Sequence, residues 1–318
     1  MRIAVPATIK PSAFVGHDRD ASLVDIGGET MGTTWKVRLA APAGLDVIGL
    51  RDAIAARLGG IVAEMSHWES ASLLCRFNRS ADQWMTLPPD FAAVIAAALT
   101  IARATDGAFD PTIGRLVTAW GFGPTRTFAP PRDAEIATAH AAAGWQRLDL
   151  DAERYRLRQP GGLALDLSGI AKGYAVDAVA ALLLDNSVRH CLVEIGGELA
   201  GRGIRPNGDP WWVDLETPSQ VALPSLRVAL HELAVATSGN YQRGNHTINP
   251  RTGRPIANPP LSVSVLHESA MLADAWATAL TVLGPVEGPS RAEREGLAVR
   301  FVDHEGDRFT SAFATMLA

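Results

Sequence analysis

Apolar positions along this chain follow the two periods that distinguish helices from strands. From Leu45 to Met65 an apolar residue recurs every three or four positions, which predicts an amphipathic helix. Around Trp35 apolar and polar residues alternate, which predicts a strand, and a Gly-rich turn joins it to an earlier strand within residues 24–40. By the same patterns, further helices are expected at residues 90–105, 134–143, 170–184 and 268–283. Further strands are expected at residues 147–150, 155–157, 163–167, 191–195, 213–215, 226–230, 235–238 and 261–266, and near Val299 and Phe309.

The order of these elements indicates an α+β protein with mixed sheets and packed helices. Strands and helices are interspersed without the strict alternation of a doubly wound parallel sheet. Proline and glycine are scattered, so no linker or repeat divides the chain. Residues 1–22 are expected to form a flexible N-terminal arm. Residues 23–318 are expected to form the functional domain, either as one unit or as two intimately packed subdomains.

The composition excludes several classes of function. The chain has 318 residues and a formal net charge of −5, so a broad nucleic-acid surface is not expected. No apolar run approaches the roughly 20 residues that cross a bilayer, so no direct membrane span is expected. Cys75 and Cys191 are in no metal-type spacing. The first 20 residues lack an apolar signal-peptide core, which favours the cytoplasm, whereas a leader missing from this N-terminus would favour the periplasm.

The segment from Leu165 to Gly173 carries the strongest chemical signal. It is expected to form a short apolar strand, a tight Ser-Gly turn and a helix with Lys172 in its first turn. A cation is unfavourable at a helix N-terminus unless an anion lies opposite it, and the exposed N–H groups there also bind anions. Only three of the 29 basic residues are lysines. We therefore interpret Lys172 as part of a phosphate site, the alternative being a surface lysine at an ordinary helix start.

A second pattern, in the segment Ala273–Thr278, indicates a cation site. Asp274 and Thr278 are four positions apart, which places a carboxylate and a hydroxyl on one face of the expected helix. The alanines between them leave room for a bulky group. Such a set is too small for a closed protein cage, but it suits Mg²⁺, which keeps water ligands and binds substrate phosphates.

Three other segments combine glycines with aromatic or sulfur-containing side chains. Met31 lies between two glycines at a strand start, and Trp68 could stack on a heterocycle, although a core tryptophan is the commoner case. Asp110, followed by a proline, suits the N-cap of a helix. His246 precedes a turn that exposes it, which is compatible with a structural or a catalytic role.

Together these segments resemble the ApbE family, the FAD:protein FMN transferases. The resemblance runs from about Gly28 to Leu283, and its motifs occur in order. They are T-M-G-T-T, A-F-D-P-T-I-G with W-G-F-G, L-D-L-S-G-I-A-K-G-Y-A-V-D, V-E-I-G-G-E-L, A-T-S-G-N-Y, H-x-I-x-P-R-T-G and A-D-A-x-A-T-A-L. One turn departs from the family's frequent H-I-I-D-P, because Thr247 and Asn249 replace an isoleucine and an aspartate.

The resemblance implies a T-fold-like α+β core and a reaction that splits FAD. FMN becomes esterified through its phosphate to a threonine of an acceptor flavoprotein, and AMP is released. FAD is then the substrate, with Mg²⁺ or Mn²⁺ as cofactor. The FAD-binding residues that it implies are Met31, Trp68, Ala108, Phe109, Asp110, Asp166, Lys172 and Leu261. The Gly169 carbonyl, Asp274 and Thr278 are implied to hold the metal, and His246 to assist catalysis.

The residues themselves are compatible with this chemistry and leave two questions open. Cleaving a pyrophosphate requires neutralising the charge that develops on its oxygens, which a metal ion, Lys172 and a helix N-terminus can do. The threonine hydroxyl needs a base within about 3 Å, and Asp274 and His246 are both candidates. With water in place of the threonine, the same site would be an FAD pyrophosphatase. A third hypothesis is a protein that binds flavin without turnover, but binding alone does not need the metal ligands.

Overall fold

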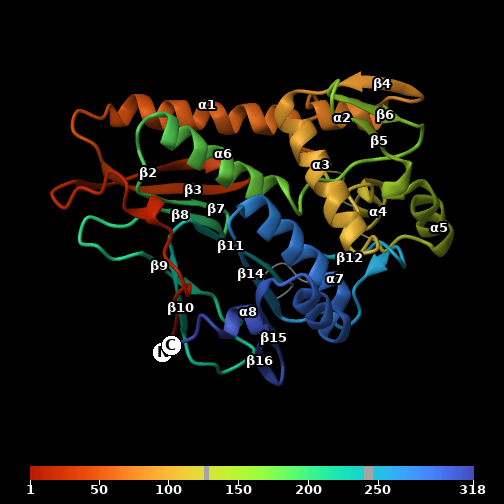
Figure 1. The fold of residues 1–318 in the computed structure, drawn as a ribbon. Helices are drawn as coiled ribbons and strands as arrows, with labels where there is room; N and C mark the ends of the chain where they lie inside the picture. Colours follow the sequence, from red (N-terminus) through yellow and green to blue (C-terminus); the bar gives the residue numbers. More distant parts are fainter. Residues whose placement is uncertain (125–128, 240–245) are drawn as a thin grey trace.

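An eight-stranded antiparallel sheet forms the centre of the molecule (Figure 1). The computed structural model describes residues 1–124, 129–239 and 246–318. Within them the strand order is β16-β15-β14-β11-β8-β7-β3-β2. On β3 the predicted alternation is present, since Trp35, Val37 and Leu39 are buried. The strands are β2 (Ser22–Thr30), β3 (Thr33–Ala41), β7 (Cys191–Ile195), β8 (Glu198–Arg202), β11 (Leu233–Gly239), β14 (Ser262–His267), β15 (Ala298–Asp303) and β16 (Gly306–Phe309).

Helices α1 (Val47–Met65), α6 (Ala171–Asp185) and α7 (Ala270–Arg294) pack against this sheet. Helix α1 begins where the Asp46 carboxylate accepts the Gly49 N–H, and it buries the apolar face that the sequence predicts. Helix α6 lies beside both α1 and α7 (Figure 1). The three helices therefore pack side by side, with α6 between α1 and α7.

Helices α6 and α7 meet with almost no space between their backbones. A Cβ on Gly173 would lie 2.2 Å from the Ala270 carbonyl oxygen and 2.8 Å from the Asp274 Cβ, so only glycine permits this approach. The Asp177 carboxylate, one turn further along α6, accepts the Ala270 and Met271 N–H groups at 2.9 and 3.0 Å. It thereby caps the N-terminus of α7 and fixes the two helices in register.

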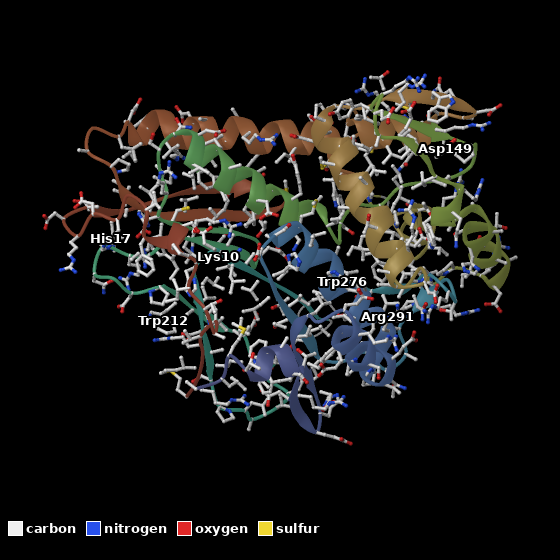
Figure 2. All side chains as sticks on the ribbon, viewed as in Figure 1. Lys10, His17, Asp149, Trp212, Trp276 and Arg291 are labelled. Atoms are coloured by element: carbon white, nitrogen blue, oxygen red, sulfur yellow. The ribbon has the colours of Figure 1, made fainter. Side chains whose placement is uncertain are left out.

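Helix α7 extends beyond the end predicted for it at residue 283. Gly284 has φ 74° and ψ −171°, which are not helical, so the predicted helix ends there and a second helical segment follows. Arg291 lies in that segment (Figure 2). Its guanidinium donates to the carbonyl of Ala104, the last residue of α3 (Pro89–Ala104). The second segment thus ties α7 to the neighbouring helices.

A smaller group of elements lies at one end of the molecule (Figure 1). Strands β4 (Gln83–Thr86), β6 (Arg156–Gln159) and β5 (Asp149–Asp151) form an antiparallel sheet in that order. Strands β12 (Ile248–Asn249) and β13 (Arg254–Pro255) form a short pair. The helices of this region are α2 (Leu73–Arg79), α3 (Pro89–Ala104), α4 (Gly114–Ala119), α5 (Asp133–Ala142) and the 3₁₀ turn η2 (Trp145–Arg147).

Two local predictions in this region are wrong. Residues 163–167 form no strand of a sheet; the Asn78 side chain satisfies both the N–H and the C=O of Leu165, at 2.7 and 2.9 Å, in place of a ladder. Asp110 is not a helix N-cap, because α4 begins only at Gly114. Its carboxylate instead accepts the N–H and hydroxyl of Thr112, which closes a turn before the helix.

The N-terminal residues are also more ordered than the flexible arm that we expected for residues 1–22. Strand β1 (Arg2–Ala4) pairs in parallel with β10 (Leu226–Leu230), which pairs with β9 (Trp211–Leu215). A 3₁₀ turn, η1 (Pro11–Phe14), follows, and near the C-terminus helix α8 (Ser311–Ala314) packs on the same side. The reason is burial, because Ala4 has no exposed surface, and Ala318 donates to the Ile3 carbonyl at 3.0 Å. The two chain ends therefore lie together.

The predicted α+β class is confirmed. Most predicted helices and strands are present to within a few residues. The elements that were not anticipated are α2, α8, β1, β4, β8, β12 and β13. Among the described residues no helix is both long and apolar enough to cross a bilayer.

We expect Gly173→Ala to destabilise the protein by about 1–3 kcal/mol, because the added methyl would overpack the contact between α6 and α7. The matched control is Gly59→Ala on α1, where a Cβ would meet no atom within 4 Å. That change should leave the free energy of unfolding unaltered or raise it by about 1 kcal/mol. Urea unfolding of both variants measures the difference, and equal stabilities would contradict the close approach.

Candidate active site

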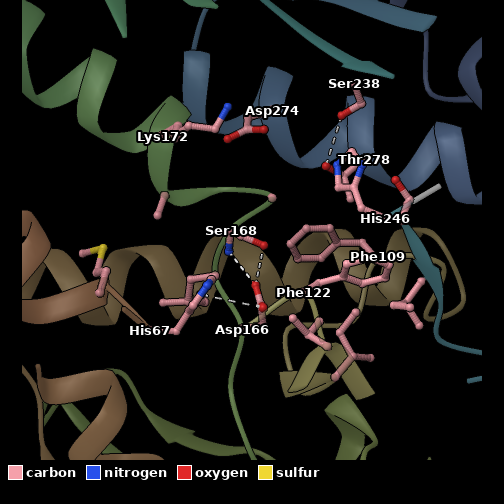
Figure 3. A pocket seen from close by; sticks show the side chains of 18 of the residues that line it. His67, Phe109, Phe122, Asp166, Ser168, Lys172, Ser238, His246, Asp274 and Thr278 are labelled. Atoms are coloured by element: carbon pink, nitrogen blue, oxygen red, sulfur yellow. Dashed lines mark hydrogen bonds and ion pairs between the residues drawn. The ribbon is translucent and has the colours of Figure 1, made fainter. Parts of the chain in front are cut away.

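A cavity of about 420 Å³ opens where the central sheet, the end of α1, the start of α6, the middle of α7 and the smaller group of elements meet. Met31 and Thr33 reach it from the β2–β3 turn, and Gly196 and Glu198 from the β7–β8 turn. The start of α6 and the middle of α7 form one wall, and loops at residues 66–68 and 108–113 form another (Figure 3). Segments distant in the sequence thus converge on one cavity that is open to solvent.

The cavity brings together all the predicted site residues except Leu261. Those that line it are Met31, Trp68, Ala108, Phe109, Asp110, Asp166, Gly169, Lys172, His246, Asp274 and Thr278. Leu261 lies just before β14, outside this lining, where its N–H donates to the Val302 carbonyl at 2.8 Å. Asn240 and Tyr241 of the A-T-S-G-N-Y motif lie outside the described residues.

Three charged side chains meet on the wall formed by α6 and α7. The Lys172 ammonium forms an ion pair with the buried Glu198 carboxylate. The Asp274 carboxylate, 4 % exposed, accepts the Gly173 N–H at 3.1 Å, and Lys172 points toward it (Figure 3). The anion that the sequence predicts opposite Lys172 is therefore, in this structure, a carboxylate of the protein itself.

Burial perturbs both carboxyl groups of this trio. Burial and the charge of Asp274 raise the pKa of Glu198 to about 7, although Lys172 opposes the change. Burial likewise raises the pKa of Asp274, against the effects of Lys172 and of the Gly173 N–H. When both acids are ionised, the trio carries one excess negative charge in a poorly solvated place, and a cation would stabilise it.

Oxygen atoms suited to a hard cation lie beside this trio. The Thr278 hydroxyl is 3.3 Å from the Ser238 hydroxyl, and a Cβ on Gly169 would lie 2.9 Å from the Thr278 Oγ1, so the Gly169 backbone approaches that hydroxyl closely. No group of three or more His, Cys, Asp or Glu side chains with metal-site geometry occurs in the described part of the chain. The donor set therefore fits Mg²⁺ with water and phosphate ligands, and it does not fit a closed protein cage.

The opposite wall combines a third buried acid with aromatic rings. Asp166, 8 % exposed, accepts the N–H and the hydroxyl of Ser168 at 2.8 and 2.5 Å, and its other oxygen is 3.8 Å from the His67 Nδ1 (Figure 3). The ring of Trp68 is 61 % exposed, whereas Phe109 is buried. An exposed tryptophan at a cavity is available to stack on a flat ligand.

Two other predicted residues take their positions from neighbouring side chains and backbone. Burial raises the pKa of Asp110, although hydrogen bonds from Thr112 and the Trp145 N–H oppose the change. His246 packs edge-on against the Phe122 ring, with centroids 6.4 Å apart. Phe122 belongs to the W-G-F-G motif, so this motif positions the histidine at the cavity.

Sequence reasoning missed Glu198, Ser238 and His67 as residues of the site. Glu198 ends the V-E-I-G-G-E segment, and the two glycines have φ 58° and 101°, values that favour glycine and that turn the chain back toward the cavity. A charged residue directly after such a turn, among buried strands, was the available signal. Ser238 stands in the A-T-S-G-N-Y motif and His67 directly precedes Trp68, but neither carries a distinguishing pattern.

Comparisons with known proteins show the family to which the chain belongs. The ApbE family model matches residues 31–301. An FAD:protein FMN transferase of Klebsiella pneumoniae is 34 % identical over 300 residues, which cover 89 % of this chain and 85 % of the relative. One of Vibrio cholerae is 35 % identical over 309 residues, covering 93 % and 92 %. The apo crystal structure of the Pseudomonas stutzeri flavinyl transferase ApbE superposes with a TM-score of 0.87 at 35 % identity, over 93 % of this chain and 97 % of that one.

We expect Lys172→Met to destabilise the protein at about pH 8, because it leaves Glu198 and Asp274 buried without their cation. Glu198→Gln in the same chain should restore much of the loss, giving a coupling free energy of about 0.5–3 kcal/mol. A double-mutant cycle from urea unfolding in metal-free buffer measures it. Strict additivity of the two changes would contradict the charge cluster.

Proposed function

We propose that this chain, which belongs to the ApbE family, transfers FMN from FAD to a threonine of an acceptor flavoprotein in a Mg²⁺-dependent reaction. The threonine Oγ forms a bond to the phosphorus of the FMN half, the bridging P–O bond breaks, and AMP leaves with the bridging oxygen. The observation that carries the proposal is the single cavity with two unlike walls. FAD needs both, since it joins flat rings to a pyrophosphate.

The charged wall would hold the pyrophosphate. Lys172 and the N-terminus of α6 supply positive charge, and Asp274, Thr278 and the Gly169 carbonyl would hold Mg²⁺ or Mn²⁺. When bound, the metal ion would neutralise charge on the phosphate oxygens. Met31, Trp68, Phe109, Asp110 and Asp166 would contact the rest of FAD.

His246 is the better candidate for the base that takes the threonine proton. One Asp274 oxygen already accepts the Gly173 N–H, so its other oxygen is the one left for a metal ion. His246 lies on the cavity lining, and its ring makes a T-shaped contact with the Phe122 ring. A neutral imidazole within hydrogen-bond reach of a hydroxyl can act as a general base.

The purified chain, FAD, Mg²⁺ and an acceptor flavoprotein test the proposal. We expect the acceptor to gain the mass of one FMN less one water, with one AMP formed per modified acceptor. Free FMN and AMP without modified acceptor would identify an FAD pyrophosphatase instead. Bound, intact FAD would identify a binding protein. Intact-mass spectrometry and chromatography of the nucleotides distinguish the three.

Asp274→Asn should lower the transfer rate at least 100-fold while leaving the fold intact, because the amide loses the charge that would attract the metal ion. FAD affinity in metal-free buffer should not fall, since the ring contacts lie on the other wall. The control is Asp52→Asn, an exposed position on α1 outside the cavity lining. Full Mg²⁺-dependent transfer by Asp274→Asn would overturn the metal assignment.

A further inference from the structure

Glu198 is a buried carboxylate on the cavity wall that has no part in the transfer as described. It is 3 % exposed, its Oε1 binds Lys172, and its Oε2 has no hydrogen-bond partner among the described residues. A buried acid that is only half satisfied costs free energy. We therefore expect Glu198 to have a function at this site that offsets this cost.

The β7–β8 turn fixes where Glu198 points. Gly196 donates to the Thr34 carbonyl at 3.1 Å, and a Cβ on it would lie 2.8 Å from Thr33 Cγ2, so the turn is packed against β3. Glu198 is the first residue of β8 and pairs with Ile195 across the turn. This rigid support holds the carboxylate beside the start of α6.

Lys172 has two competing demands on its charge. Its side chain is 31 % exposed, so it can meet a ligand, yet it is already paired with Glu198. A pyrophosphate entering the cavity would have to share Lys172 and would also lie near two carboxylates, Glu198 and Asp274. When both carboxyl groups are ionised and no other cation is present, the wall carries one net negative charge, which disfavours an anionic ligand.

We propose that Glu198 is a positioning residue that makes binding of the pyrophosphate depend on prior or simultaneous binding of a divalent cation. By pairing with Lys172 and adding negative charge, it weakens binding of the bare anion and strengthens binding of the cation. This inference rests on the proposed function for the identity of the anion. It makes the order of assembly a property of the protein, because FAD would be held tightly only when the metal ion is present.

Glu198→Gln tests this role with two probes that the enzyme does not consume. Inorganic pyrophosphate is titrated calorimetrically in metal-free buffer, and Mn²⁺ alone is titrated by electron paramagnetic resonance, both at about pH 8. We expect the variant to bind pyrophosphate about tenfold more tightly and Mn²⁺ about tenfold more weakly. The matched control is Glu194→Gln, in the same hairpin but outside the cavity lining, which should behave as the wild type for both.

Opposite shifts of the two affinities are the signature of the charge role. If Glu198 has a merely structural role, the variant should bind both probes more weakly. If Glu198 has no role, both affinities should stay unchanged. Either result would overturn the inference. The variant should fold, since the amide replaces a carboxylate with an unpartnered oxygen and Lys172 can reach solvent. A wild type that shows the expected affinities but never modifies an acceptor would overturn the proposed function alone.

Discussion

The close contact between α6 and α7 at Gly173 is the constraint on which the site depends. Because residue 173 has no side chain, the start of α6 lies directly against the start of α7, at Ala270 and Asp274. That contact brings Lys172 to Asp274, and the Gly173 N–H to the Asp274 carboxylate. The Asp177 cap holds the same register one turn away. A pair of helices packed at ordinary distance would separate these charges.

The second requirement is that the charged wall be poorly solvated. Burial raises the pKa of both Glu198 and Asp274, because little water reaches these carboxyl groups to stabilise their charged forms. Such a place favours the combined entry of a cation and a phosphate group over either alone. The aromatic wall across the cavity supplies the unlike surface that a flavin ring needs.

Sequence patterns predicted the helices and strands in which a hydrophobic period continues over many residues, and the site residues that lie in short motifs. The i, i+4 pair of Asp274 and Thr278 and the lysine at a helix start were recognisable because one helix turn places them. The strand predicted at 163–167 failed because the Asn78 side chain, 87 positions away from Leu165, satisfies its backbone. Glu198 was missed for a similar reason: pairing between distant segments, not local pattern, buries it beside Lys172.

Oxygen-18 water tests directly whether the threonine hydroxyl or water is the nucleophile. The reaction is run with FAD, Mg²⁺ and acceptor in labelled water, and the products are analysed by mass spectrometry. If the threonine hydroxyl attacks the FMN phosphorus, the protein-bound FMN and the released AMP both contain no oxygen-18. Oxygen-18 in FMN or AMP would mean that water is the nucleophile, and would contradict the account.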